Sequence, residues 1–98
     1  MTAQDRLDKI NSQLNSSLTD LNRLHLFYNN LTTACLFTEA EVIKSRILDV
    51  ISLVDKLLQK ETEILKILGL LQTGSKEYRA NLEKYFKLYE YNRYYSPK

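Results

Sequence analysis

Residues that interrupt helices are scarce in this sequence of 98 residues, which contains two glycines and one proline. A β-sandwich or β-barrel needs a turn every few residues and uses glycine and proline to make them. The scarcity excludes those folds and favours an all-α chain. A chain of this length forms a single domain, and its hydrophobic content of 44% is sufficient for a core.

Paired cysteines and long apolar runs are also missing. Cys35 is the one cysteine, which excludes an intramolecular disulfide and the class of small disulfide-bonded secreted domains. The first residues do not combine positive charge with an apolar run, so no signal peptide is recognised. The apolar runs do not exceed about four residues, too few to span a membrane. We expect an intracellular protein of the cytoplasm or nucleus.

The residue patterns that support catalysis or metal binding are absent as well. The sequence has no glycine-rich phosphate loop, no histidines or cysteines at metal-ligand spacing, and no arrangement of nucleophile and base. His25 is the lone histidine, and we expect it to lie partly exposed on the surface. We predict that the protein is not an enzyme, has no cofactor and takes no small-molecule substrate. The net charge of +2 is too small to predict binding to nucleic acid or to a membrane surface.

A heptad pattern fills the first third of the chain. Two interleaved series recur at every seventh position, Leu7, Leu14, Leu21, Tyr28 and Cys35, and Ile10, Ser17, Leu24 and Leu31, and in them Ser17 alone breaks the apolar pattern. The pattern predicts a helix over residues 3–32 with a coiled-coil-like seam. Because Cys35 falls in the register of the seam, we predict a buried, inert thiol. A reactive thiol near the start of the next helix is the alternative.

A second helix is predicted over residues 39–72. Thr38 followed by Glu41 matches a capping box, and Phe37 with Val42 have the spacing of a hydrophobic staple. Gly74 marks the end of the helix. The apolar positions form a stripe wide enough for two neighbours, which places this helix at the centre of a three-helix unit. They are Ile43, Ile47, Val50, Val54, Leu57, Ile64, Leu68 and Leu71.

Two residues of this second helix have more than one interpretation. Gly69 either allows another helix to approach closely, or marks an early end or a kink. Glu61 stands where the pattern calls for an apolar residue. We favour a side chain that reaches out to solvent over a buried polar group that sets the register of the helices.

A third, shorter helix is predicted over residues 76–94, with Ser75 as its N-cap. The segment from residue 74 onward holds six of the seven tyrosines, and six Lys or Arg against three Glu. We expect three of the tyrosines, Tyr78, Tyr85 and Tyr89, to pack in the core. Four residues near the end are candidates for contact with a partner, because Tyr and Arg dominate protein interfaces: Tyr91, Arg93, Tyr94 and Tyr95.

Together these segments predict three antiparallel helices, long, long and short, in a coiled-coil-like bundle. Because the third helix is too short to cover both others, we expect part of the seam to remain available, formed by Leu7, Ile10 and Leu14 with Ile43, Ile47 and Val50. The sequence is therefore typical of a structural or adaptor protein that contacts another protein, or a second copy of itself, through helices. An inhibitor or chaperone that masks its partner is one alternative. Weak binding of single-stranded nucleic acid by the tyrosine-rich and basic C-terminus is another, which we regard as unfavoured.

Overall fold

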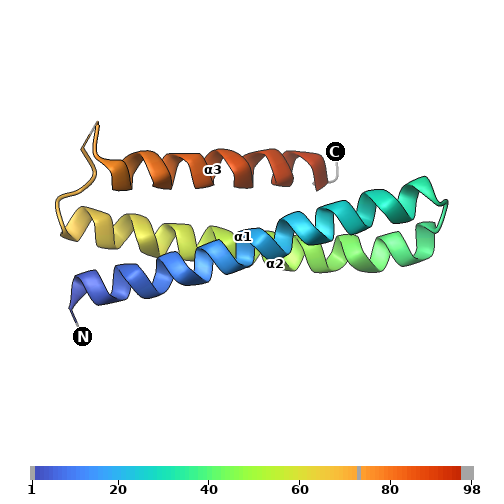
Figure 1. Ribbon diagram of the computed structural model, residues 1–98, viewed down its shortest axis with the longest axis horizontal. Helices are drawn as coiled ribbons and strands as arrows, with labels where there is room; N and C mark the ends of the chain where they lie inside the picture. Colours follow the sequence, from blue (N-terminus) through green and yellow to red (C-terminus); the bar gives the residue numbers. More distant parts are fainter. Residues whose placement is uncertain (1, 73, 96–98) are drawn as a thin grey trace.

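The computed structural model describes residues 2–72 and 74–95 and contains three helices: α1 (Ala3–Thr33), α2 (Phe37–Ile67) and α3 (Lys76–Tyr95). No strand occurs in these two ranges. The prediction of an all-α fold with two long helices and one short helix is confirmed. Figure 1 shows that α1 and α2 form an antiparallel hairpin and that α3 runs back along α2.

Helix α2 is the centre of the molecule, because both other helices pack against it. Among the described residues, no Cα atom of α1 lies within 8 Å of a Cα atom of α3. The molecule is elongated, with extents of 49 × 26 × 19 Å and a radius of gyration of 15.5 Å. A compact domain of this length would have a radius of gyration of about 13 Å. Helix α3 stops short of the turn between α1 and α2 (Figure 1).

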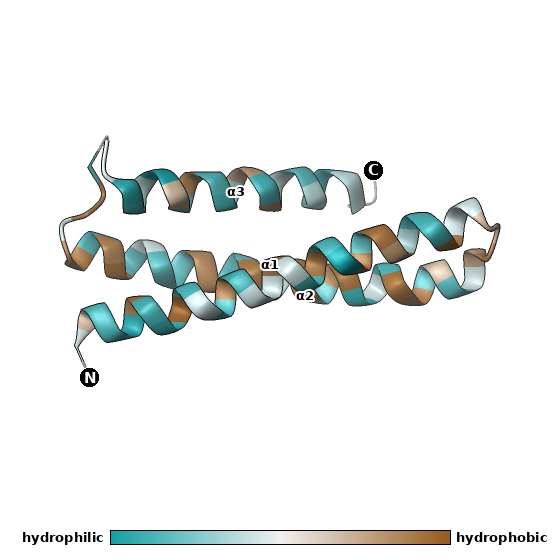
Figure 2. Cartoon of the chain, in the orientation of Figure 1, coloured by the Kyte–Doolittle hydropathy of each residue, from teal (hydrophilic) through white to brown (hydrophobic). Residues whose placement is uncertain are grey.

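The core is formed by the faces that α1, α2 and α3 turn toward one another. Leu7, Leu14 and Leu21 are all buried, as the heptad pattern predicted. The main cluster combines Leu14 and Leu21 of α1 with five apolar residues of α2, from Ile47 to Leu58, and with two residues of α3. Figure 2 shows hydrophobic colour along α1 and α2 and at the turn between them, whereas α3 is largely hydrophilic.

Helix α1 begins and ends with hydrogen bonds that match known capping motifs. At its start, the Thr2 hydroxyl accepts from the Asp5 amide at 3.1 Å, and the Asp5 carboxylate accepts from the Thr2 amide at 3.2 Å. At its end, the Leu36 amide donates to the Leu31 carbonyl at 2.9 Å and the Cys35 amide donates to the Thr32 carbonyl at 3.1 Å. This pair of bonds is a Schellman motif.

Cys35 adopts the left-handed conformation that this motif requires, with φ at 61°. Glycine is the usual residue there, because a Cβ atom is strained in that region. The prediction of a buried thiol at Cys35 is wrong, since the side chain is exposed. The helix has already ended at Thr33, so the heptad register no longer decides where the Cys35 side chain points.

The predicted capping box at the start of α2 is also wrong. The helix begins at Phe37, one residue after Leu36, which has no side-chain capping bond. The tight turn at Cys35 lets the Ala40 amide reach the Leu36 carbonyl at 3.0 Å, so Thr38 already lies inside the helix. Phe37 and Val42 are exposed at 61% and 67%, and they therefore do not form a buried staple.

Gly69 marks an early end of α2, one of the possibilities that the sequence left open. The helix ends at Ile67, not near residue 72. Gly69 has φ at 70°. The Leu70 amide donates to the Leu65 carbonyl at 2.8 Å and the Gly69 amide donates to the Lys66 carbonyl at 3.1 Å, which is a second Schellman motif. Gly74 lies in the connection to α3, also with positive φ.

The start of α3 follows the prediction. The Ser75 hydroxyl accepts from the Tyr78 amide at 3.0 Å and donates to the Leu70 carbonyl at 2.7 Å, which ties the helix start to the end of α2. The residues that α3 buries are spaced by seven: Asn81, Leu88 and Tyr95. Tyr78 and Tyr85 are half-buried, but Tyr89 is 65% exposed, so the prediction that Tyr89 packs in the core is wrong.

Candidate functional site

The apolar residues predicted to remain available for a partner lie in the core of the chain. Leu7, Leu14 and Ile47 are buried at 7%, 0% and 0% exposure. Ile10, Ile43 and Val50 are partly buried and pack against the core cluster. These six residues do not form one surface, because the hairpin is antiparallel: Leu7 packs with Ile64 and Leu65, far from the start of α2.

The four candidates at the end of α3 divide into two groups. Tyr95 is 2% exposed and belongs to the core, so its predicted role as a surface contact is wrong. Tyr91 is half-buried, and its hydroxyl donates to the Asn22 side chain of α1 at 3.2 Å. Arg93 and Tyr94 are exposed. The aromatic residues at this end therefore serve largely to attach α3 to α1.

His25 is the centre of that attachment. Its ring lies edge-on to Tyr91, Tyr94 and Tyr95, with centroid distances of 5.3, 5.3 and 5.6 Å. The Nε2 atom accepts from the Asn29 side-chain amide at 3.4 Å, which leaves Nδ1–H to donate to the Tyr95 hydroxyl. Burial raises the pKa of Tyr95, with smaller contributions from neighbouring tyrosines. Burial and the nearby Glu90 carboxylate raise the pKa of Tyr91.

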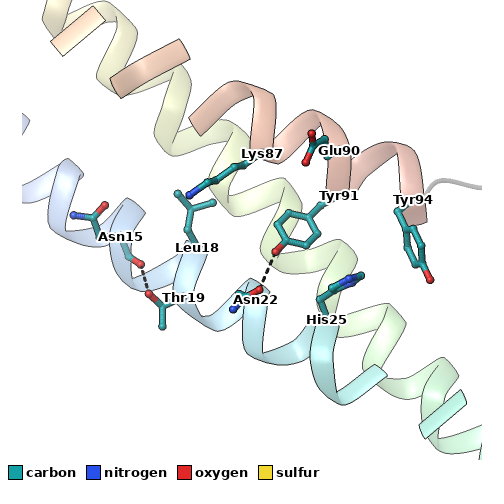
Figure 3. Close-up of a pocket in the computed structure, with 9 residues that line it drawn as sticks. All are labelled: Asn15, Leu18, Thr19, Asn22, His25, Lys87, Glu90, Tyr91 and Tyr94. Atoms are coloured by element: carbon teal, nitrogen blue, oxygen red, sulfur yellow. Dashed lines mark hydrogen bonds between the residues drawn. The ribbon is translucent and has the colours of Figure 1, made fainter. Parts of the chain in front are cut away.

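A groove of about 840 Å³ runs between α1 and α3 beside this cluster (Figure 3). Its lining combines Asn15, Leu18 and Asn22 of α1 with Lys87, Glu90 and Tyr91 of α3, among others. Figure 3 shows the Tyr91 ring crossing from α3 to Asn22. Within the described residues, no group of three or more His, Cys, Asp or Glu could hold a metal ion. The groove follows from the wide separation of the two backbones and is spanned by long side chains.

A second set of polar side chains connects all three helices, and it lies closer to the start of α1 than the His25 cluster does. Glu61 of α2 is 3% exposed, so the prediction that it reaches out to solvent is wrong. One carboxylate oxygen accepts from the Asn81 amide at 2.9 Å and the other accepts from Lys84 at 3.0 Å. Lys84 also donates to the Asn11 side chain of α1 at 2.8 Å. Glu61 is the buried polar group that the sequence left as the alternative, and its partners come from α3.

A group of exposed apolar side chains lies near the turn of the α1–α2 hairpin. We call it the hairpin end, and it comprises four exposed apolar residues: Leu26 at 55%, Phe27 at 50%, Leu36 at 46% and Phe37 at 61% exposure. Val42, at 67% exposure, lies outside this set, next to Glu41 on α2. Tyr95, the last residue of α3, packs beside His25 and Tyr28, so α3 does not extend to Leu36 and Phe37, while Leu26 and Phe27 lie level with its end and are exposed. Residues 24–38 contain no Asp, Glu, Lys or Arg. Loss of charge combined with exposed aromatic residues is typical of the centre of a protein interface.

A second exposed apolar strip lies on α3 and consists of Leu82, Phe86 and Tyr89. The three residues share one face of the helix, at helical spacing. Charged residues alternate with them along the helix, namely Arg79, Glu83, Glu90 and Arg93. This strip is therefore smaller and more polar than the hairpin end.

The elongated molecule exposes more surface than a compact monomer of its mass. The chain exposes 6953 Å², whereas a compact monomer of 11.5 kDa exposes about 5,800 Å². The excess of about 1,100 Å² is comparable to the roughly 800 Å² that each partner contributes to a standard protein interface.

Comparison of the chain with protein-family models, with curated proteins and with solved structures finds no match in any of the three. Within the described residues, every helix is too short or too polar to cross a membrane.

Proposed function

We propose that this chain is a non-enzymatic interaction protein, a structural or adaptor subunit, and that it binds another protein through helix–helix contacts at the hairpin end. The observation that carries this proposal is the exposure of four large apolar side chains, Leu26, Phe27, Leu36 and Phe37, in a segment without Asp, Glu, Lys or Arg. Several large apolar side chains exposed near one end of a protein, without charged residues among them, often mark an interaction site. A partner that offers an apolar groove or helix face fits this surface.

The hydrophobic gain available at the hairpin end is comparable to the cost of association. Its four residues are each about half exposed, and fully burying one such side chain stabilises by about 1.5–3 kcal/mol. Covering all four therefore contributes about 3–6 kcal/mol, and a partner surface of equal size doubles this. Association costs about 4–15 kcal/mol. The apolar contacts offset this cost, and polar contacts at the rim then decide the affinity.

The experiment compares two phenylalanines of nearly equal exposure. Phe37 at the hairpin end is 61% exposed, and Phe86 on α3 is 66% exposed. We expect Phe37→Glu to abolish capture of the partner from a cell extract, as identified by mass spectrometry, and Phe86→Glu to retain it. An acidic residue in the first turn of α2 suits the helix dipole, so Phe37→Glu should fold normally, which circular dichroism checks. Capture of the same proteins by both variants would contradict the proposal.

An inhibitor or chaperone would use the same apolar contacts, and it differs in what binding does to the partner. Once the partner is known, its activity or its aggregation is measured with wild-type protein and with Phe37→Glu. A structural subunit leaves the partner's activity unchanged and increases the stability of the complex. An inhibitor suppresses that activity in proportion to the bound fraction.

A further inference from the structure

We propose that the hairpin end is covered by the hairpin end of a second copy of this chain, in a two-fold symmetric dimer. This inference rests on the proposed function, because it names the partner of the same surface. In such a dimer α1 and α2 of one copy pack against α1 and α2 of the other and form a local four-helix bundle. Helix α3 ends at Tyr95 and stops short of the turn between α1 and α2, where Leu36 and Phe37 lie (Figure 1).

The surplus of exposed surface is large enough for one dimer interface of standard size. Each chain exposes about 1,100 Å² more than a compact monomer of its mass. A standard dimer interface takes about 800 Å² from each partner. The excess thus matches a single dimer contact, with a few hundred Å² left for the weaker strip on α3.

The distribution of charge favours a second copy as the occupant. Two-fold symmetry places the same patch of both chains face to face, so a charged patch would meet charge of its own sign. The stretch from residue 24 to residue 38 has no charged side chain, and the first ones beyond it, Arg23 and Glu39, have opposite signs. A symmetric pair can therefore form without like-charge repulsion between residues 24–38 of the two copies.

The apolar strip on α3 is less suitable for a two-fold dimer contact, and a lipid surface is a less suitable partner for the hairpin end. A two-fold contact through Leu82, Phe86 and Tyr89 would bring Arg79, Glu83, Glu90 and Arg93 of both copies into the interface. A lipid surface would require an excess of Lys and Arg around the hairpin end. The flanking charges instead cancel, with Asp20, Glu39 and Glu41 against Arg23, Lys44 and Arg46.

The test is the mass of the purified full chain in solution, measured by sedimentation equilibrium between about 1 and 200 μM. The monomer has a mass of 11.5 kDa, and we expect twice this value, about 23 kDa, at the upper concentrations. Phe37→Glu alters both sides of a two-fold contact, so we expect it to weaken dimerisation at least 100-fold and to sediment as a monomer. Phe86→Glu should dimerise as the wild type does.

Three results would overturn the inference. The first is a wild-type monomer at every concentration, which leaves the proposed function in place if Phe37→Glu still loses a different partner. The second is a dimer that Phe86→Glu disrupts and Phe37→Glu does not, which assigns the contact to α3. The third is binding to phosphatidylcholine–phosphatidylserine vesicles by a monomer, lost in Phe37→Glu, which assigns the hairpin end to a lipid surface. If no protein at all depends on Phe37, the proposed function fails with the inference.

Discussion

Replacing Cys35 by glycine should stabilise the protein, because Cys35 holds a backbone conformation that costs energy for any residue with a Cβ atom. Its φ of 61° places it in the left-handed region, where a side chain is strained by about 1–2 kcal/mol. Glycine removes that strain but gains conformational freedom in the unfolded chain, which costs about 0.5–1 kcal/mol. The exposed thiol makes no core contact that would be lost. The expected net gain is therefore about 0.5–1 kcal/mol.

Urea unfolding followed by circular dichroism measures this gain. With a slope of about 1–3 kcal/mol per molar urea, the midpoint of Cys35→Gly should rise by a few tenths of a molar unit. Cys35→Ala is the matched control, because it also removes the thiol but keeps a Cβ atom in the left-handed region. Gly69→Ala places a Cβ atom in the equivalent position at the end of α2 (φ 70°) and should destabilise by about 1 kcal/mol. If Cys35→Gly proves no more stable than Cys35→Ala, the account of the α1–α2 turn is wrong.

Two further predictions concern the contacts that attach α3. Glu61→Ala should destabilise the fold by about 3–5 kcal/mol in urea unfolding, because it leaves Lys84 without its buried partner. The double variant Glu61→Leu with Lys84→Leu should recover most of that loss, and no recovery would mean that the ion pair is not the cause. The raised pKa of Tyr95 means that the folded state keeps a proton that the unfolded state releases above about pH 10. The contribution of the neutral Tyr95 side chain to the free energy of unfolding is therefore present below pH 10 and is lost as the pH rises further. Tyr95→Phe should show a smaller loss of stability between pH 9 and pH 11 than the wild type, and an equal loss would refute the assignment to Tyr95.

The helices were predictable because their signals are local and repeated. Leu7, Leu14 and Leu21 recur at an interval that only a helix turns into one face, and all three are buried. Ser75 likewise marks a helix start through its own hydroxyl. The end of α2 was predicted less well, because Gly74 was expected to mark it and the early end at Gly69 was one of several possibilities. The capping box at Thr38 failed because the tight turn at Cys35 started α2 two residues earlier than the side-chain signal indicated.

The residues whose placement was wrong depend on partners distant in the sequence. Whether Glu61 is buried depends on Asn81 and Lys84, some twenty residues later, arriving opposite its carboxylate. Tyr95 is buried because His25 and Tyr28 happen to lie level with the end of α3. No periodicity within one helix contains this information, since it depends on how far the helices slide along one another.

The exposure of the hairpin end was only partly predictable from the sequence. Its exposure depends on the length and position of α3, which the sequence alone left open to within several residues. A signal was nevertheless present, because residues 24–38 combine apolar and aromatic side chains with a complete lack of Asp, Glu, Lys and Arg. A helix that faced solvent around its outer side would carry charge there, as α2 does beyond residue 43.

The position of Cys35 allows the most direct measurement of the central claim, that partners bind at the hairpin end. As the one cysteine in the chain, and exposed at the turn, it accepts a maleimide-linked photo-crosslinker without further engineering. The matched control carries the same probe on α3, in the double variant Cys35→Ser with Phe86→Cys. We expect the probe at Cys35 to cross-link to a partner protein or to a second copy of the chain, and the probe on α3 to give little product. Cross-linking from α3 alone would contradict the account.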